Sequence, residues 1–177
     1  MIDQKISHAF SRPALFLDRD GVLNVDHGYV SRIEQLEWMP GARQAVRLAN
    51  EAGMWVFVVT NQSGIARGFH DEAAVESLHA HMGRELVAAG ARVDAFRYCP
   101  HLPGGSVARF SRECGCRKPA PGMILDLIGA YGVDASASLM IGDKQSDLAA
   151  AAAAGVPSAL FEGGDLAAFV ASRLRGV

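Results

Sequence analysis

Residues 14–24 read ALFLDRDGVLN: four apolar residues run directly into Asp18-Arg19-Asp20-Gly21. A short apolar run that ends in charge is typical of a buried parallel strand reaching the carboxyl edge of its sheet. Ligands bind at that edge in open α/β sheets. Two like charges this close repel each other, so the pair needs a cation between them or a shifted proton affinity. The alternative is a solvated acidic turn after a strand.

Apolar runs and helical periodicities alternate along the rest of the chain. Strands are expected at Ala14–Asp18, Met54–Thr60, Ala95–Cys99, Ser138–Gly142 and Pro157–Phe161. Four helices are expected at residues 40–53, from Pro121 to about Tyr131, and over Ser146–Ala154 and Leu166–Leu174. A further, long helix is expected to begin after an Asp71 cap, with Val75, Leu78, Met82 and Leu86 along one apolar stripe. Residues 1–13 read as a loose arm, and 25–40 and 100–117 as irregular segments. The alternation predicts an α/β fold with a doubly wound parallel sheet.

Length and charge limit the possible classes of protein. The 177 residues suggest a single domain, 1–177, with no large cap, because no segment between the motifs is long enough to fold alone. A net charge of −2 gives no basic surface for nucleic acid. No apolar run approaches the roughly 20 residues that span a bilayer, and residues 1–13 lack a secretory apolar region. We expect a cytoplasmic protein with no membrane partner, and a monomer.

Reactive residues follow three of the predicted strands. Asp18-x-Asp20, Thr60-Asn61 and Gly142-Asp143 end strands, and Arg117-Lys118-Pro119 precedes a helix. A parallel sheet brings all of these to one edge. Carboxylates, a hydroxyl and a cation suit phosphoryl transfer, in which catalysis is mostly positioning and charge stabilisation. Carboxylate oxygens also suit Mg²⁺, and a carboxylate can attack phosphorus to form an aspartyl-phosphate.

Four motifs in this order resemble those of haloacid-dehalogenase-like phosphatases: DRDGVLN, VVTNQSG, CRKP and MIGDKQSD, between Ala14 and Gly155. The resemblance implies the Rossmann-like haloacid dehalogenase fold. Within that superfamily, VDHGYV, TNQSGIARG and YCPH…CGCRKP look most similar to the phosphatases that remove the 7-phosphate of D-glycero-D-manno-heptose 1,7-bisphosphate. The nearest relatives of those enzymes are the histidinol-phosphate phosphatases.

The resemblance implies a role for each matching residue. Asp18 would be the nucleophile, and Asp20 would protonate the leaving alcohol and then deprotonate the hydrolytic water. Mg²⁺ would be held by Asp18, the backbone carbonyl of Asp20, and Asp143. The phosphoryl group would be bound by Thr60, Asn61 and Lys118. The remainder of the substrate would be bound by rim residues: Asp26, His27, Gly28, Tyr29, Gln62, Ser63 and Arg117.

Two further charged residues have open roles. Asp147 shares a helix face with Asp143, and it could orient Lys144 or a metal-bound water, or act as a helix-start acid. Arg67 could face a second anionic group or be a solvated loop charge.

All three cysteines fall in one loop, as Cys99-x-His101 and Cys114-x-Cys116. Three thiols and an imidazole form a Cys₃His set, the composition of a closed structural zinc site. The loop, 99–117, contains Pro103, Gly104 and Gly105 and is expected to have no apolar core of its own. Zinc would then fix its shape and support Arg117 and Lys118. The alternative is three reduced thiols beside a surface histidine.

We therefore expect a Mg²⁺-dependent phosphatase that acts on a small phosphorylated sugar and carries a structural zinc. Histidinol phosphate is the alternative substrate, although no extra acidic or aromatic cluster is visible for its cation and ring. Transfer to an acceptor other than water, and a non-catalytic zinc-bearing binding module, are the alternatives from other classes. The sequence leaves the preferred C1 anomer and the pathway open.

Overall fold

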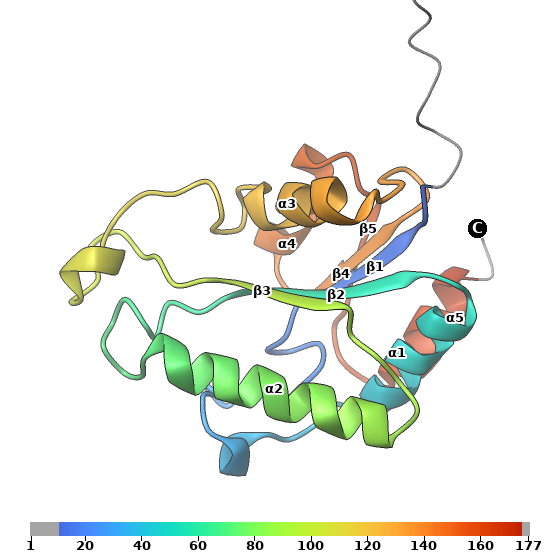
Figure 1. Cartoon of the computed structure of the whole chain (residues 1–177), viewed down its shortest axis with the longest axis horizontal. Helices are drawn as coiled ribbons and strands as arrows, with labels where there is room; N and C mark the ends of the chain where they lie inside the picture. The colour runs from blue at the N-terminus through green and yellow to red at the C-terminus, as the bar shows by residue number, and fades with distance from the viewer. Residues whose placement is uncertain (1–10, 175–177) are drawn as a thin grey trace, which may run out of the picture.

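In the computed structural model, which describes residues 11–174, five parallel strands form one sheet (Figure 1). The strands are β1 (Ala14–Leu17), β2 (Trp55–Asn61), β3 (Ala95–Cys99), β4 (Leu139–Gly142) and β5 (Ser158–Leu160), in the order β3-β2-β1-β4-β5. All four neighbouring pairs are parallel. The predicted parallel α/β sheet is thus confirmed, and β1, which carries the Asp18 motif at its end, lies at its centre.

Five α-helices cover the two faces of the sheet. They are α1 (Ala42–Glu51), α2 (Glu72–Ala88), α3 (Gly122–Tyr131), α4 (Gln145–Ala153) and α5 (Leu166–Leu174). Helices α1, α2 and α5 lie on one face, and α3 and α4 lie on the other (Figure 1). Side chains of β1 alternate between the two cores: Leu15 and Leu17 pack toward the first group of helices, and Phe16 toward the second.

Element boundaries agree with those expected from the sequence to within one or two residues. The Asp71 side chain accepts a hydrogen bond from the Ala74 N–H at 2.9 Å and caps α2, as predicted. Two short 3₁₀ turns, η1 (Ile33–Gln35) and η2 (Ala108–Phe110), lie in segments expected to be irregular.

Residues 1–10 of the predicted arm lie outside the described residues. Within residues 11–174, no helix combines the length and apolarity needed to cross a membrane.

The segment 100–117 differs from expectation, because it has a small apolar cluster. Phe110 is 8% exposed and packs with Ile65, Ala66 and Val75, and Leu102 and Val107 lie against the same cluster. The expectation that this loop has no core was wrong. Its apolar residues are too widely spaced to show a periodicity, and their partners come from other segments: the loop after β2, α2 and Tyr98 of β3.

Candidate active site

A pocket of about 210 Å³ lies at the carboxyl edge of the sheet. Its lining includes most of the residues that the sequence analysis selected: Asp18, Asp20, Asp26, Gly28, Tyr29, Thr60, Asn61, Gln62, Ser63 and Lys118. Gly64, Lys144, Ser146 and Asp147 complete it. The parallel sheet therefore brings together residues more than 120 positions apart in the chain.

Asp18 follows the last residue of β1 and is 5% exposed. Its Oδ1 accepts hydrogen bonds from the Arg19 N–H at 2.8 Å and from Lys118 Nζ at 2.9 Å. Burial raises the pKa of Asp18 to about 6, although Lys118 opposes that shift. Among the described residues Oδ2 has no hydrogen-bond donor, so this oxygen is available to attack a substrate.

Lys118 lies buried between two carboxylates. Its Nζ is 2.9 Å from Asp18 Oδ1 and 2.7 Å from Asp147 Oδ1, and it donates to the Val59 carbonyl at 2.7 Å. Burial alone would lower the pKa of Lys118, but Asp18 and Asp147 raise it, so the ammonium stays charged. The Asn61 side chain holds Lys118 through its backbone, with hydrogen bonds of 3.0 and 3.1 Å.

Asp147 is a helix-start acid, as one alternative of the sequence analysis proposed, and it also has an ion pair that was not considered. It is 1% exposed, and besides its contact with Lys118 its Oδ2 accepts from the Lys144 N–H at 3.0 Å at the start of α4. It therefore combines a helix-start position with a buried ion pair. Gly142 makes room for it, because a Cβ at that position would collide with the Asp147 side chain.

Asp20 is fixed by three neighbours. Arg19 donates to both its carboxylate oxygens at 2.9 and 3.0 Å, Asn24 Nδ2 donates to Oδ1 at 3.0 Å, and Gln62 Nε2 donates to Oδ2 at 2.9 Å. Gln62 also donates to Thr60 Oγ1 at 2.9 Å. Arg19 was missed in the sequence analysis, because a charged side chain beside a strand end is usually exposed and its burial here depends on tertiary contacts.

The carboxylates of Asp18 and Asp143 form a potential cation site. Ligand oxygens of Asp18, Asp143 and Asp147 lie within 4.8 Å of one another, but both oxygens of Asp147 already have donors. Asp143 Oδ1 is buried without a partner. Gly21 has φ +87°, and a Cβ there would collide with the Asp143 carboxylate, so the glycine permits this approach. An orphaned carboxylate oxygen facing a second carboxylate fits a hard divalent cation.

The rim holds some but not all of the residues expected there. Asp26, Gly28 and Tyr29 line the pocket, whereas His27 does not, and it pairs instead with Glu37 at 2.7 Å. Tyr29 packs edge-to-face on Phe69 with ring centroids 4.8 Å apart, and both rings are exposed. The expectation that no aromatic cluster is present was wrong, because these two residues are 40 positions apart in the sequence and meet only in the fold.

Two arginines expected to reach an anionic group do not line this pocket. Arg117 lines a separate hollow with Pro103, Cys114 and Pro119, and its Nη1 donates to the His101 carbonyl at 3.2 Å. Arg67 is exposed. Lys144, by contrast, lines the pocket with its Nζ 3.6 Å from Asp26 and 3.5 Å from Asp143. Among the described lining residues the cations are therefore Lys118 and Lys144.

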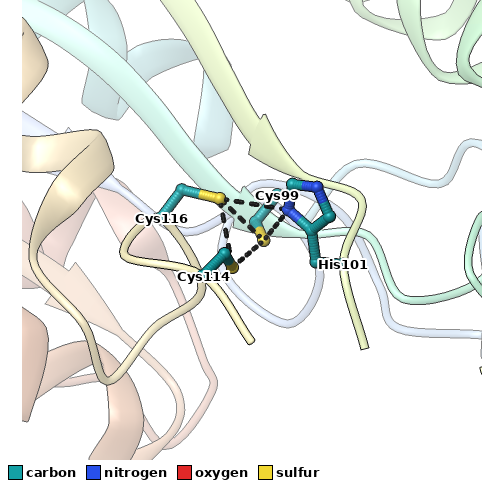
Figure 2. A group of neighbouring side chains, drawn as sticks. All are labelled: Cys99, His101, Cys114 and Cys116. Atoms are coloured by element: carbon teal, nitrogen blue, oxygen red, sulfur yellow. Dashed lines mark hydrogen bonds between the residues drawn. The ribbon is translucent and has the colours of Figure 1, made fainter. Parts of the chain in front are cut away.

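The three cysteines and His101 converge in the adjoining loop (Figure 2). The Cys116 sulfur is 3.1 Å from Cys99 Sγ, 3.4 Å from Cys114 Sγ and 3.4 Å from His101 Nδ1. None of the three is in a disulfide. Three sulfurs and one ring nitrogen around a common centre match the donor set of a structural zinc site.

Electrostatics in this cluster also favour a cation. Burial raises the pKa of Cys99 and of Cys116, so these thiols resist ionisation on their own. Burial also lowers the pKa of His101, which keeps the imidazole neutral and its nitrogen free to bind a metal. Three thiolates this close would repel one another without a positive charge between them. A cation such as Zn²⁺ among the four donor atoms would offset this repulsion.

Comparison with known proteins places these features in context. Residues 115–169 match the HAD-hydrolase-like family model. The D-glycero-beta-D-manno-heptose-1,7-bisphosphate 7-phosphatase of Rhodopseudomonas palustris is 51% identical over 159 residues, 90% of this chain and 88% of that protein. The enzyme of the same name from Escherichia coli K12 is 49% identical, covering 84% of this chain and 78% of its own.

A solved structure has the same fold. The D,D-heptose 1,7-bisphosphate phosphatase of B. bronchiseptica, complexed with magnesium and phosphate, superposes with a TM-score of 0.80 at 36% identity. The match covers 93% of this chain and 99% of that one.

Proposed function

Since the chain belongs to the D-glycero-beta-D-manno-heptose-1,7-bisphosphate 7-phosphatase family of HAD-like hydrolases, we propose that it hydrolyses the 7-phosphate of that sugar and leaves the 1-phosphate. The observation that supports this most strongly is the pairing of Asp18 with Lys118 beside Asp20 in one pocket. It provides a nucleophile, a cation for the phosphoryl group and an acid–base group at the same place.

Asp18 is proposed to attack phosphorus through Oδ2. The new Oδ2–P bond forms as the P–O bond to C7 of the sugar breaks, which leaves an aspartyl-phosphate. Lys118, the Thr60 hydroxyl and nearby backbone N–H groups would bind the equatorial oxygens of the transferring group. Because Oδ1 is held by Arg19 and Lys118, the attacking oxygen is oriented before substrate arrives.

Asp20 is proposed to move the protons. It gives a proton to the sugar oxygen as that group leaves, and then takes one from the water that attacks the phosphorus of the aspartyl-phosphate. The second step releases inorganic phosphate and regenerates the Asp18 carboxylate. Arg19, Asn24 and Gln62 hold Asp20 in place for both steps.

Asp18, the Asp20 backbone carbonyl and Asp143 are the proposed ligands of Mg²⁺. When bound, Mg²⁺ supplies positive charge that screens the carboxylates from an incoming phosphate. The unpartnered Asp143 Oδ1 supports this assignment.

Lys144 is a better candidate than Arg117 for binding the second phosphate. A bisphosphate needs a cation besides Lys118, and Lys144 lines the pocket whereas Arg117 does not. Although burial opposes it, Asp143, Asp18 and Asp26 raise the pKa of Lys144, which keeps it charged. This proposal replaces the expected role of Arg117.

Histidinol phosphate remains a second candidate substrate because of the Tyr29–Phe69 pair. Tyr29 lines the pocket and packs on Phe69, so its ring could contact an imidazole. The names of the relatives favour the heptose bisphosphate, and a direct comparison separates the two.

Phosphate release from both metabolites, with and without Mg²⁺, tests the proposal. We expect kcat/KM for the heptose bisphosphate to exceed that for histidinol phosphate by about 10⁴-fold, because hydroxyl-binding groups left unpaired penalise the other ligand. Removing Mg²⁺ with EDTA should stop turnover, and excess Mg²⁺ should restore it. The α and β anomers should be assayed separately.

Variants at Lys144 and Arg117 provide a matched control for this assay. K144M should raise KM for the bisphosphate more than R117M does, while hydrolysis of 4-nitrophenyl phosphate changes little in either. Equal efficiency on both metabolites, or a preference for histidinol phosphate, would contradict the proposed substrate.

The Cys₃His cluster is proposed to bind one structural Zn²⁺ per chain. In Cys114→Ser, zinc content should fall to less than one half, and protease sensitivity within 100–117 should rise. Activity should fall about tenfold, because Lys118 lies two residues beyond Cys116 and must stay beside Asp18. Elemental analysis of the purified protein checks the metal content. Purified protein that carries no metal, and whose cysteine thiols all react readily in the native state, would contradict a zinc site. Ser111→Ala, a change in the same loop that leaves the four donor residues intact, is the control.

A further inference from the structure

Arg19 is a buried cation beneath Asp20, and its contacts reach beyond the active site. The residue is 0% exposed, and its Nη2 donates to both oxygens of Asp20, at 2.9 and 3.0 Å, and to Gln62 Oε1 at 3.3 Å. One guanidinium edge therefore holds Asp20 together with the glutamine that supports it. The same Nη2 also donates to the Val30 carbonyl, so this carbonyl and the group that contacts Nη1 together set the direction of the guanidinium group.

His79 of α2 contacts the opposite side of Arg19. Its Nε2 is 3.2 Å from Arg19 Nη1, and the residue is 5% exposed. The imidazole ring stacks on Phe96 of β3 with centroids 4.7 Å apart and planes at 19°. The Tyr98 ring also approaches the imidazole, with centroids 6.0 Å apart and planes at 66°, so the two aromatic contacts hold the His79 nitrogen at a defined position relative to Arg19.

The chemistry of this contact defines the protonation state of His79. A guanidinium group only donates hydrogen bonds, so Nε2 must carry a lone pair and the ring proton must lie on Nδ1. Burial, and then the charge of Arg19, lower the pKa of His79 to about 3, so the ring stays neutral. At neutral pH His79 is thus neutral, and its Nε2 can accept a hydrogen bond from Arg19.

We propose that His79 is a positioning residue, which accepts a hydrogen bond from Arg19 and thereby orients the guanidinium group that holds the Asp20 carboxylate toward the leaving group. The inference rests on the proposed function, because it concerns the acid–base role of Asp20. His79 lies on the apolar stripe of α2, four residues after Val75 and three before Met82, where packing alone would be served by an apolar side chain.

The competing explanation is that His79 only fills space against Phe96. Two variants separate the explanations, because each retains one property of the histidine. His79→Phe keeps an aromatic ring for Phe96 but has no acceptor. His79→Gln loses the ring, but its amide oxygen can reach the position of Nε2. A packing role predicts that H79Q is the more damaged variant, and a positioning role predicts that H79F is.

The readout is the leaving-group dependence of kcat/KM, which reports the first phosphoryl transfer. Loss of general acid catalysis slows departure of a poor leaving group, such as the primary alkoxide of the sugar, more than that of 4-nitrophenolate. We expect H79F to lose about tenfold or more in kcat/KM on the heptose bisphosphate, but less than about threefold on 4-nitrophenyl phosphate. H79Q should stay within about threefold of wild type on both, and KM should change little.

Wild type and Asp20→Asn serve as references in the same assay. If wild type does not hydrolyse the bisphosphate, or if D20N shows no leaving-group dependence, the proposed function is wrong rather than the role of His79. Equal losses on both substrates in H79F, full activity of H79F, or greater damage in H79Q would overturn the positioning role. Should H79F not fold, His79→Leu, which is smaller and also lacks an acceptor, is compared with H79Q by the same ratio.

Discussion

Replacing Asp18 with Asn is expected to lower turnover by roughly four to six orders of magnitude while the protein stays folded. An amide oxygen is a poor nucleophile at phosphorus and a weaker ligand for a divalent cation. The fold should tolerate the change, since the Asn oxygen can still accept from the Arg19 N–H and from Lys118. Lys118 also keeps its ion pair with Asp147 at 2.7 Å.

Steady-state phosphate release and thermal unfolding measure the two parts of this prediction. Asp26→Asn is the matched control, because Asp26 lines the same pocket but is exposed at the rim. D26N should keep measurable hydrolysis of 4-nitrophenyl phosphate. Turnover of D18N within about tenfold of wild type, in protein shown by mass spectrometry to contain Asn at position 18, would rule out covalent catalysis by Asp18.

The gathering of the candidate active-site residues could be predicted because it depends on local signals. Asp18, Thr60 and Asp143 each lie at the carboxyl end of an apolar run, and parallel strands bring such ends to one edge. The Cys₃His cluster was predictable for a similar reason: two closely spaced pairs bracket one loop. In both cases the sequence spacing and the element type determine the proximity.

Pairings that depend on tertiary contact could not be predicted in this way. His79 and Arg19 are 60 residues apart and meet because α2 packs below the end of β1. Arg117 is adjacent to Lys118 in sequence, but its side chain turns to the His101 carbonyl and away from the pocket. The position of Asp147 after Asp143 suggested a shared helix face, yet its side chain pairs with Lys118, from the connection between β3 and α3.

Lys118→Met is expected to weaken both activity and stability. Met fills a similar volume but leaves Asp18 and Asp147 buried together without a counter-charge, and breaking such a buried pair costs about 3–5 kcal/mol. A loss of that size should lower Tm by roughly 10 °C. Activity should fall about 10²- to 10³-fold, because the transferring phosphoryl group loses a cation fixed beside the nucleophile.

The pH dependence and a double variant separate the two effects of K118M. Lys118 lowers the pKa of Asp18, so its removal raises that pKa further above the present value of about 6. A folded-state pKa above the unfolded value means that folding favours the protonated form. The stability deficit of K118M should therefore be smaller at pH 5 than at pH 8, which thermal unfolding can measure.

Replacing Asp147 with Asn in the K118M background removes one of the two unpaired charges, since both oxygens of Asp147 lie in the buried site. K118M/D147N should recover at least half of the lost stability but little of the lost activity, because Lys118, and not Asp147, contacts the proposed nucleophile Asp18. If K118M is as stable as wild type at pH 8, the ammonium does not compensate the two carboxylates. If the double variant regains activity along with stability, Lys118 serves the fold and not the phosphoryl group.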